Sequence, residues 1–173
     1  MKVIILGAGR IGRGFITQLM LLNHVKITYF DANDEMVKKL NDAQSYTIHV
    51  LGHPDLDIVH SDYEAYSNKD TDQMARSWAE ADFIFTACGG KNMTAVGKTI
   101  AEAFKKMYAN KQVHVSNIMT CENWVDPAKD LENSIMEELN EAELASFKEN
   151  IGVGENVILC TGTGSPDPLK VTN

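Results

Sequence analysis

The chain has 173 residues, enough for one ordinary domain with its own hydrophobic core. Hydrophobic residues make up 44% and charged residues 23%, and no apolar run is long enough to span a bilayer. The formal net charge of −8 disfavours nucleic acid and anionic membranes as partners, because both repel an acidic surface. The apolar run near the N-terminus is too short for a signal peptide, so we expect a cytoplasmic protein.

The first predicted elements form a βαβ unit. Residues Lys2–Leu6 are a continuous apolar run, typical of a strand that is buried on both faces. In the segment 10–22 that follows, apolar residues recur at helical spacing, at Ile11, Phe15, Leu19 and Leu22. Residues Val25–Phe30 are rich in β-branched and aromatic side chains and predict a second strand, which Asp31 ends. Asn33 can then cap a short helix.

The stretch 45–61 interrupts this alternation of strands and helices. Tyr46–Leu51 and Asp57–His60 are strand-like, and the turn between them contains Gly52 and Pro54. The simplest interpretation is a β-hairpin at about residues 45–61, inserted where a plain doubly wound fold carries a crossover.

Strands and helices alternate again over the rest of the chain. Further strands are predicted at Phe83–Ala87, Val113–Met119 and Val157–Cys160. Further helices are predicted to start near Asp70, Asn92, Asp126 and Asn140. This order predicts an α/β fold with a doubly wound, mostly parallel Rossmann sheet. The tail is rich in glycine and proline, so we assign residues 1–160 to the domain and expect 161–173 to begin a connection to a further domain.

A glycine-rich loop follows the first strand directly and opens the first helix. Its sequence, GAGRIG at 7–12, matches the G-x-G-x-x-G pattern of dinucleotide-binding βαβ units. Gly7 permits the tight turn, Gly9 lets a pyrophosphate approach the backbone, and Gly12 lets the helix pack against the strand. The helix N-terminus offers free N–H groups and a partial positive charge to phosphates. The alternative is a tight turn that binds no ligand.

Asp31, at the end of the second strand, is placed to accept hydrogen bonds from the adenosine ribose hydroxyls of a dinucleotide. A 2′-phosphate there would meet a like charge, which favours NAD over NADP. Arg10 and Arg13 weaken that preference, because either could reach a phosphate. S-adenosylmethionine is a rival ligand, since its binding sites also use a glycine-rich loop and an acidic residue after the second strand.

The turn at Ala87 and Cys88, after the strand at Phe83–Ala87, is a candidate second contact. Ligands of open α/β sheets lie over the carboxyl ends of the strands near the switch point, and small residues there let a cofactor approach. The alternative is a plain strand-ending turn. The expected cofactor-binding residues are Gly7, Ala8, Gly9, Arg10, Ile11, Gly12, Asp31, Ala87 and Cys88.

The segment Cys121-Glu122-Asn123 follows the next strand on the same edge of the sheet. Cys121 could serve as a nucleophile if a base lay beside it, and Glu122 as an acid or base. Asn123 could donate its amide N–H to a substrate oxygen that becomes negative during hydride transfer, and we take it as the candidate catalytic residue. Capping and turn formation remain the structural alternative for all three.

Neither the cysteines nor the histidines show metal-ligand spacing. The three cysteines, Cys88, Cys121 and Cys160, lie far apart and are most simply small buried side chains in a reducing compartment. The histidines are interpreted as surface or packing residues. We therefore expect no metal site.

Taken together, these residues resemble the mannitol dehydrogenase family, the polyol-specific long-chain dehydrogenases. The resemblance rests on GAGRIGRGFI at 7–16, on Asp31, on Ser45-Tyr46 with His49 and Val50, and on NIMTCENWV at 117–125. It covers nearly the whole chain and is weakest between about Asp62 and Glu80. The loop alone is unspecific, whereas loop, hairpin and C-E-N segment in this order are fairly specific.

The resemblance implies an N-terminal Rossmann domain that binds NAD and works without metal, followed by a largely helical catalytic domain. The family's catalytic lysine lies in a K-x-x-x-x-N-x-x-H motif of that second domain. Here Lys105 and Asn110 fit the first spacing, but Val113 stands where the histidine belongs, so the motif is absent. The chain thus resembles the cofactor domain without the catalytic one, and Asn123 matches the family's asparagine that helps to hold the substrate oxygen.

The implied activity of the intact protein is hydride transfer between NAD and a polyol or polyol phosphate, with mannitol 1-phosphate and fructose 6-phosphate as the first candidates. The partner is then a small sugar alcohol or sugar phosphate. A hexuronate reductase of the same family, a non-catalytic NAD-sensing module and a methyltransferase are the alternatives. We expect residues 1–173 to be inactive without a catalytic domain.

Overall fold

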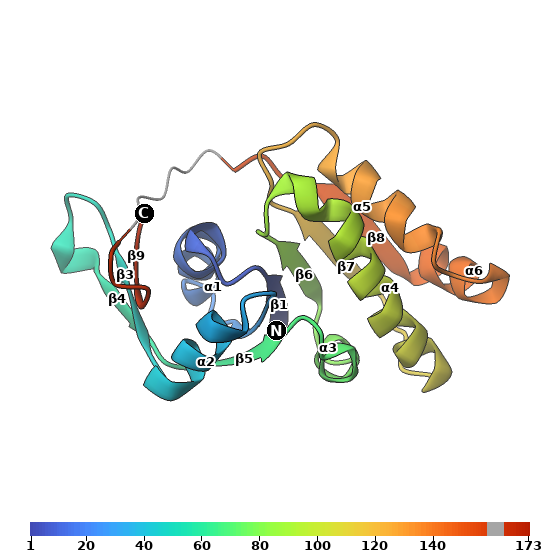
Figure 1. Ribbon diagram of the computed structural model, residues 1–173, viewed down its shortest axis with the longest axis horizontal. Coiled ribbons are helices and arrows are strands. Elements are labelled where there is room, and N and C mark those ends of the chain that lie inside the picture. The colour runs from blue at the N-terminus through green and yellow to red at the C-terminus, as the bar shows by residue number, and fades with distance from the viewer. Residues whose placement is uncertain (159–164) are drawn as a thin grey trace.

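The computed structural model describes residues 1–158 and 165–173, and its centre is a six-stranded sheet in which all neighbouring strands run parallel (Figure 1). The strands are β1 (Lys2–Leu6), β2 (Lys26–Asp31), β5 (Tyr63–Ser67), β6 (Phe83–Thr86), β7 (Ser116–Thr120) and β8 (Ile151–Glu155). Their order is β5-β2-β1-β6-β7-β8, so the strand order reverses between β1 and β6. This doubly wound arrangement confirms the predicted fold class.

Helices cover both faces of the sheet (Figure 1). One face carries α3 (Thr71–Trp78), α4 (Met93–Ala109), α5 (Pro127–Met136) and α6 (Glu141–Asn150). The other carries α1 (Thr17–Leu21) and α2 (Asp34–Ala43). Strand β1 divides its side chains between the two cores, Ile4 and Leu6 to one, Val3 and Ile5 to the other, as a strand buried on both faces must. Within the described residues no helix has the length and apolarity needed to cross a membrane.

The first helix differs from its prediction, because it opens with a π-helix at Ile11–Ile16. The wider π turn rotates the residues that follow relative to ideal α-helical spacing. As a result Leu19 and Leu22 are 42% and 72% exposed, although their spacing predicts an inner stripe. The buried positions are instead Gly12, Arg13, Gly14, Ile16 and Thr17.

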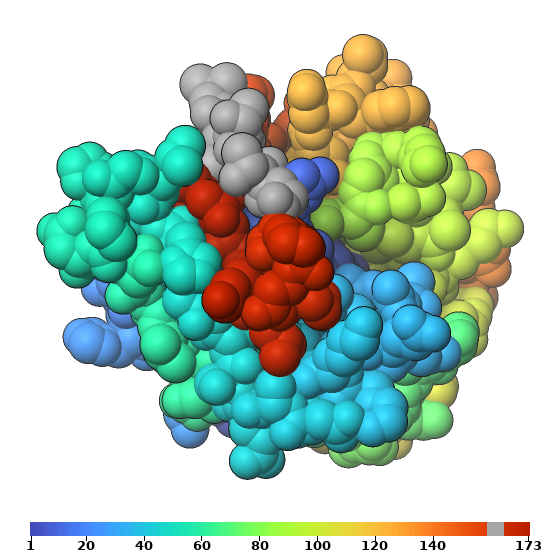
Figure 2. All heavy atoms as spheres, turned by 60° about the vertical axis from the view of Figure 1, so that its left-hand side comes forward, coloured from blue at the N-terminus to red at the C-terminus, as the bar shows by residue number. Residues whose placement is uncertain are grey.

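The predicted hairpin is confirmed. Strands β3 (Tyr46–His49) and β4 (Ile58–His60) pair antiparallel on either side of a 3₁₀ turn at Pro54–Leu56. They belong to a separate three-stranded sheet, whose third strand is β9 (Lys170–Thr172), parallel to β3. Figure 2 shows the C-terminal residues (red) packed against the hairpin (teal). This last strand is not predicted from the sequence.

The predicted strand at Val157–Cys160 is wrong where the described residues cover it. The edge strand is β8 at Ile151–Glu155, while Val157 is 77% exposed and outside any strand. Positions 159 and 160, Cys160 among them, lie outside the described residues. Two glycines conceal the true strand, and each has a packing reason. A Cβ at Gly152 would meet Asn117 Oδ1 at 2.4 Å, and one at Gly154 would meet the Met119 side chain at 3.1 Å.

His60, in β4, is expected to make the stability of the fold depend on pH. Its ring is buried against Tyr46 and Tyr63, with centroid distances of 5.6 and 5.3 Å. Burial lowers the pKa of His60, and nearby Asp62 opposes this only in part. As the pH falls, His60 of the unfolded chain therefore takes up a proton near pH 6.5, whereas His60 of the folded chain does so only at lower pH. Protonation of His60 thus favours the unfolded chain, and the free energy of unfolding falls as the pH drops below about 6.5. We expect His60→Phe to reduce the fall in melting temperature between pH 7.5 and 5.5; an equal fall in both proteins would contradict this.

Candidate functional site: a cleft at the carboxyl end of the sheet

The glycine loop is held against two strands by its first and last glycines. Gly7 donates its N–H to Phe30 O at 2.8 Å and has φ +103°. A Cβ there would lie 2.4 Å from Ala87 O at the end of β6. A Cβ at Gly12 would lie 2.0 Å from Gly7 O and 3.1 Å from the Ile5 side chain. Both positions therefore require glycine for the close packing of loop, helix and strands.

Gly9 is different, because protein packing does not demand a glycine there. A Cβ at this position would have no atom of the described residues within 4 Å. Gly9 lines a cleft of about 430 Å³ at the point where the strand order reverses. The missing side chain leaves the backbone open toward that cleft, which fits a bound group that must approach the loop closely.

The cleft has an apolar floor and polar positions around it. Leu6, Phe30, Met74 and Val96 contribute large apolar side chains. The polar lining residues are Asp31, Asn68, Asn92 and Thr99. Such an arrangement, mostly apolar with a few polar groups, is typical of small-molecule sites. The carboxyl ends of the strands, α3 and the start of α4 together bring these residues to one place.

Five of the sequence-predicted residues line the cleft: Gly7, Gly9, Asp31, Ala87 and Cys88. Ala8, Arg10, Ile11 and Gly12 are not among the lining residues. The contribution of α4 is not predicted from the sequence, although Ala95 and Thr99 are one turn apart and line the cleft. In the sequence, the small side chains at this spacing near the start of a helix are the signal that could have identified α4 as part of the cleft.

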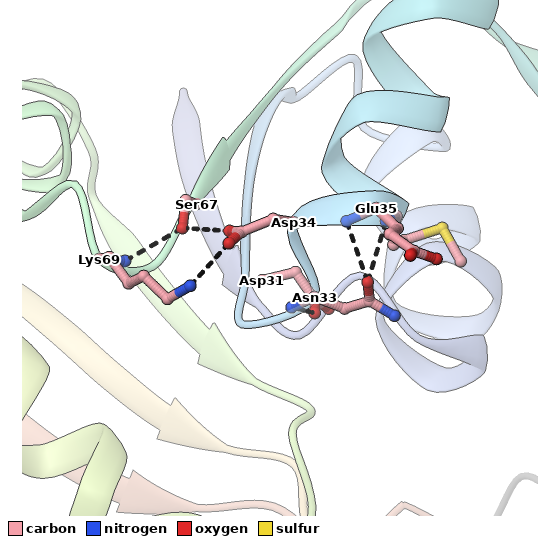
Figure 3. Close-up of polar contacts among 7 residues, drawn as sticks. Asp31, Asn33, Asp34, Glu35, Ser67 and Lys69 are labelled. Carbon is pink, nitrogen blue, oxygen red and sulfur yellow. Dashed lines mark hydrogen bonds and ion pairs between the residues drawn. The ribbon is translucent and has the colours of Figure 1, made fainter.

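Asp31 links the end of β2 to the glycine loop. Its carboxylate accepts the Ala8 N–H at 2.6 Å and the Asn33 N–H at 2.8 Å. Asn33 in turn caps α2 by accepting from Glu35 N and Met36 N (Figure 3). A carboxylate has about four acceptor positions, so two remain for a ligand. These bonds fix the carboxylate at the edge of the cleft before any ligand arrives.

A second carboxylate lies beside Asp31 but is already bound. Asp34 accepts the Ser67 hydroxyl at 2.7 Å and pairs with the Lys69 ammonium at 2.6 Å (Figure 3). Hydrogen bonding to Lys69 and Ser67 lowers the pKa of Asp34. Asp34 does not line the cleft. It ties the start of α2 to the end of β5.

Arg13 points away from the cleft, contrary to the possibility that it reaches a phosphate. The side chain is buried, and its Nε donates to Ala8 O at 2.6 Å behind the loop. The guanidinium lies 5.2 Å from the centre of the Tyr46 ring. Burial lowers the pKa of Arg13, and the surrounding tyrosines oppose this. Arg13 thus supports the loop from behind rather than contacting what the loop holds.

Both backbone polar groups of Cys88, its N–H and its carbonyl oxygen, are hydrogen-bonded to side chains. The Cys88 N–H donates to Glu122 Oε1 at 2.9 Å, and its carbonyl accepts from Asn92 Nδ2 at 2.6 Å. Asn92 precedes α4, and its side chain makes this contact with the turn and does not cap the helix. Burial, together with the Glu122 carboxylate, raises the pKa of the Cys88 thiol well above its usual range. The turn therefore offers the cleft a neutral, largely apolar wall.

The segment after β7 divides into two buried residues and one exposed residue. Cys121 is 6% exposed, and burial raises its pKa to about 11, so the thiol stays protonated and unsuited to nucleophilic attack at neutral pH. The Glu122 carboxylate is engaged by backbone N–H groups. Asn123 is exposed and is not among the cleft-lining residues. Of the three, Asn123 is the one whose side chain faces solvent.

Within the described residues, no group of three or more His, Cys, Asp or Glu side chains is placed to hold a metal ion.

The parallel sheet, the glycine loop at the switch point and the acidic residue after β2 define a Rossmann domain. The chain belongs to the mannitol dehydrogenase family: residues 1–172 match its Rossmann domain, described as "Mannitol dehydrogenase Rossmann domain". The family predicted from the sequence is thereby confirmed.

Two curated relatives agree with this family assignment, and a solved structure shares the fold. Mannitol-1-phosphate 5-dehydrogenase of Lactiplantibacillus plantarum is 36% identical over 147 residues, which cover 84% of this chain and 38% of that protein. The enzyme of the same name from Shouchella clausii is 29% identical over 99% of this chain and 46% of its own length. The structure of Pseudomonas fluorescens mannitol 2-dehydrogenase with NAD and D-mannitol matches with a TM-score of 0.67 at 13% identity, over 88% of this chain and 40% of that one. The chain thus spans less than half the length of these proteins.

Proposed function

We propose that the cleft binds NAD(H) and that this chain is the cofactor-binding domain of an NAD-dependent oxidoreductase. The observation that carries the proposal is Gly9, which lines the cleft and has no atom of the described residues within 4 Å of the place where a Cβ would lie. Protein packing does not explain a glycine there, whereas a pyrophosphate close to the loop does. Asp31 adds a fixed carboxylate at the same cleft.

The residues of the cleft suit the ribose, the adenine and the pyrophosphate of NAD. The two unused acceptor positions of Asp31 suit the adenosine ribose hydroxyls, and the apolar floor around Phe30, Met74 and Val96 suits the adenine. The loop at Gly9 and the helix start behind it suit the pyrophosphate. When bound, NAD supplies the hydride donor or acceptor. The protein's own part is to bind and orient it and to keep a 2′-phosphate away from Asp31.

We further propose that the intact protein acts on a polyol phosphate, with mannitol 1-phosphate and fructose 6-phosphate as the pair. Support comes from the names of the relatives that match most of this chain. Asn123, exposed after β7, would donate its amide N–H to the substrate oxygen and stabilise negative charge there. The base would come from a catalytic domain joined after residues 161–173, since the relatives extend well beyond the matched region.

Titration of residues 1–173 with NADH tests the cofactor proposal. We expect saturable enhancement of NADH fluorescence, displacement by NAD, weaker binding of NADPH and no competition by S-adenosylmethionine. The same chain is expected to show no turnover with mannitol 1-phosphate and NAD. Absence of NADH binding would refute the cofactor assignment, and turnover by this chain alone would refute the division of labour between two domains.

A further inference from the structure

The turn after β6 and the segment after β7 are joined by a buried carboxylate. Glu122 is 7% exposed, and its two oxygens accept the backbone N–H groups of Cys88 and Gly89, each at 2.9 Å. Gly89 has φ +89°, a conformation that side chains other than glycine rarely adopt. The carboxylate therefore holds two successive amides of a sharp turn, one oxygen to each.

This arrangement places an acidic side chain inside the protein on backbone hydrogen bonds. Among the described residues, the ion pairs do not include Glu122. Burying a carboxylate is costly unless strong hydrogen bonds compensate, and hydrogen bonds from backbone N–H groups to an ionised oxygen are among the stronger ones. The two backbone N–H groups thus supply the hydrogen bonds that the buried carboxylate needs, and the carboxylate in turn joins the two amides of the turn.

A second contact joins the same two segments. A Cβ at Gly90 would lie 2.2 Å from both Cβ and Cγ of Trp124, so the indole side chain packs directly on the glycine. Asn123 stands between the two residues that make these contacts. These contacts join the cleft wall at Cys88 to the segment that carries the exposed Asn123.

We propose that Glu122 is a positioning residue that fixes the turn at Cys88 and Gly89 against the cofactor and sets the place of Asn123 relative to it. The inference rests on the proposed function, because the wall it fixes is that of the proposed NAD cleft. A carboxylate offers each of the two N–H groups an acceptor oxygen of its own. Glutamine keeps one acceptor and turns an NH₂ group toward the other N–H.

Amide exchange and NADH titration on residues 1–173 test this inference. In the unchanged protein we expect the Cys88 and Gly89 amides to exchange slowly with deuterium, and in Glu122→Gln to exchange much faster. We expect Glu122→Gln to bind NADH about tenfold more weakly, in line with the loss of one hydrogen bond to a charged group. Glu155→Gln, an exposed change at the end of β8, is the matched control and is expected to alter neither readout.

A third variant separates positioning from packing. Glu122→Asp keeps both acceptor oxygens, so we expect it to bind NADH more tightly than Glu122→Gln does. Equal loss in the two variants, or unchanged NADH affinity in Glu122→Gln, would overturn the proposal. Fast exchange of both amides in the unchanged protein would overturn it even if the variants failed to fold. Failure of the unchanged protein to bind NADH, with both amides protected, would instead refute the proposed function.

Discussion

Replacing Asp31 by asparagine is expected to weaken NADH binding by about ten- to hundredfold, since a hydrogen bond to a charged group contributes about 1.5–3 kcal/mol. The change removes the charge that the ribose hydroxyls would meet. It also turns an NH₂ group toward the N–H of Ala8 or of Asn33, both of which now donate to the carboxylate. The discrimination against NADPH is expected to shrink, because the like charge facing a 2′-phosphate is gone.

The measurement is a pair of fluorescence titrations, with NADH and with NADPH, on the unchanged chain and on the variant. Asp34→Asn is the matched control, because Asp34 is an aspartate close by in the chain that is bound by Ser67 and Lys69 and does not line the cleft (Figure 3). We expect it to leave NADH affinity within about twofold of the original value, as befits an exposed ion pair. A larger loss in Asp34→Asn than in Asp31→Asn would contradict the assignment of Asp31.

The features of this site that the sequence predicts are those encoded within one βαβ unit. The glycine loop and Asp31 lie in adjacent segments, and the packing reasons inferred for Gly7 and Gly12 are visible as close approaches to Ala87 and Gly7 O. The alternation of strands and helices along most of the chain also predicts the doubly wound sheet.

The features that the sequence does not predict depend on contacts between distant residues or on backbone irregularity. Glu122 binds amides 33 and 34 residues before it, and the local pattern of C-E-N does not identify those partners. Strand β9 becomes a strand by pairing with β3, far earlier in the chain. The π-helix changes which side of the first helix is buried, and apolar spacing read at 3.6 residues per turn cannot detect it.

The π-helix and β9 also meet, which shows how the first helix and the end of the described chain support each other. A Cβ at Gly14 would lie 2.3 Å from Asn173 Oδ1, and Asn173 Nδ2 donates to Gln18 Oε1 at 2.8 Å. Asn173 also donates its backbone N–H to His49 O at 2.9 Å. The helix that begins at the glycine loop is thus braced by the small sheet. This bracing lies behind the loop, on the same side as Arg13, and leaves the cleft side free.

Substitutions at two glycines of the same loop are expected to separate an effect on NADH affinity from an effect on stability most clearly. Gly9→Ala places a methyl group where no atom of residues 1–158 or 165–173 lies within 4 Å, so we expect the melting temperature to stay unchanged. The same methyl group occupies the cleft side of the loop, where the pyrophosphate would approach. We expect NADH affinity to fall by about ten- to hundredfold, the equivalent of about 1–3 kcal/mol of steric conflict.

Gly12→Ala is expected to lower stability first and to weaken NADH binding only as a consequence. Its methyl group would lie 2.0 Å from Gly7 O, a backbone atom that cannot move without displacing the loop. We expect the free energy of unfolding to fall by about 1–3 kcal/mol, and NADH binding to weaken only as a consequence of the displaced loop. Urea denaturation beside NADH titration distinguishes the two variants. If Gly9→Ala lost stability while keeping its NADH affinity, Gly9 would be a packing residue, and the cleft would lose the feature that most directly identifies it as a dinucleotide site.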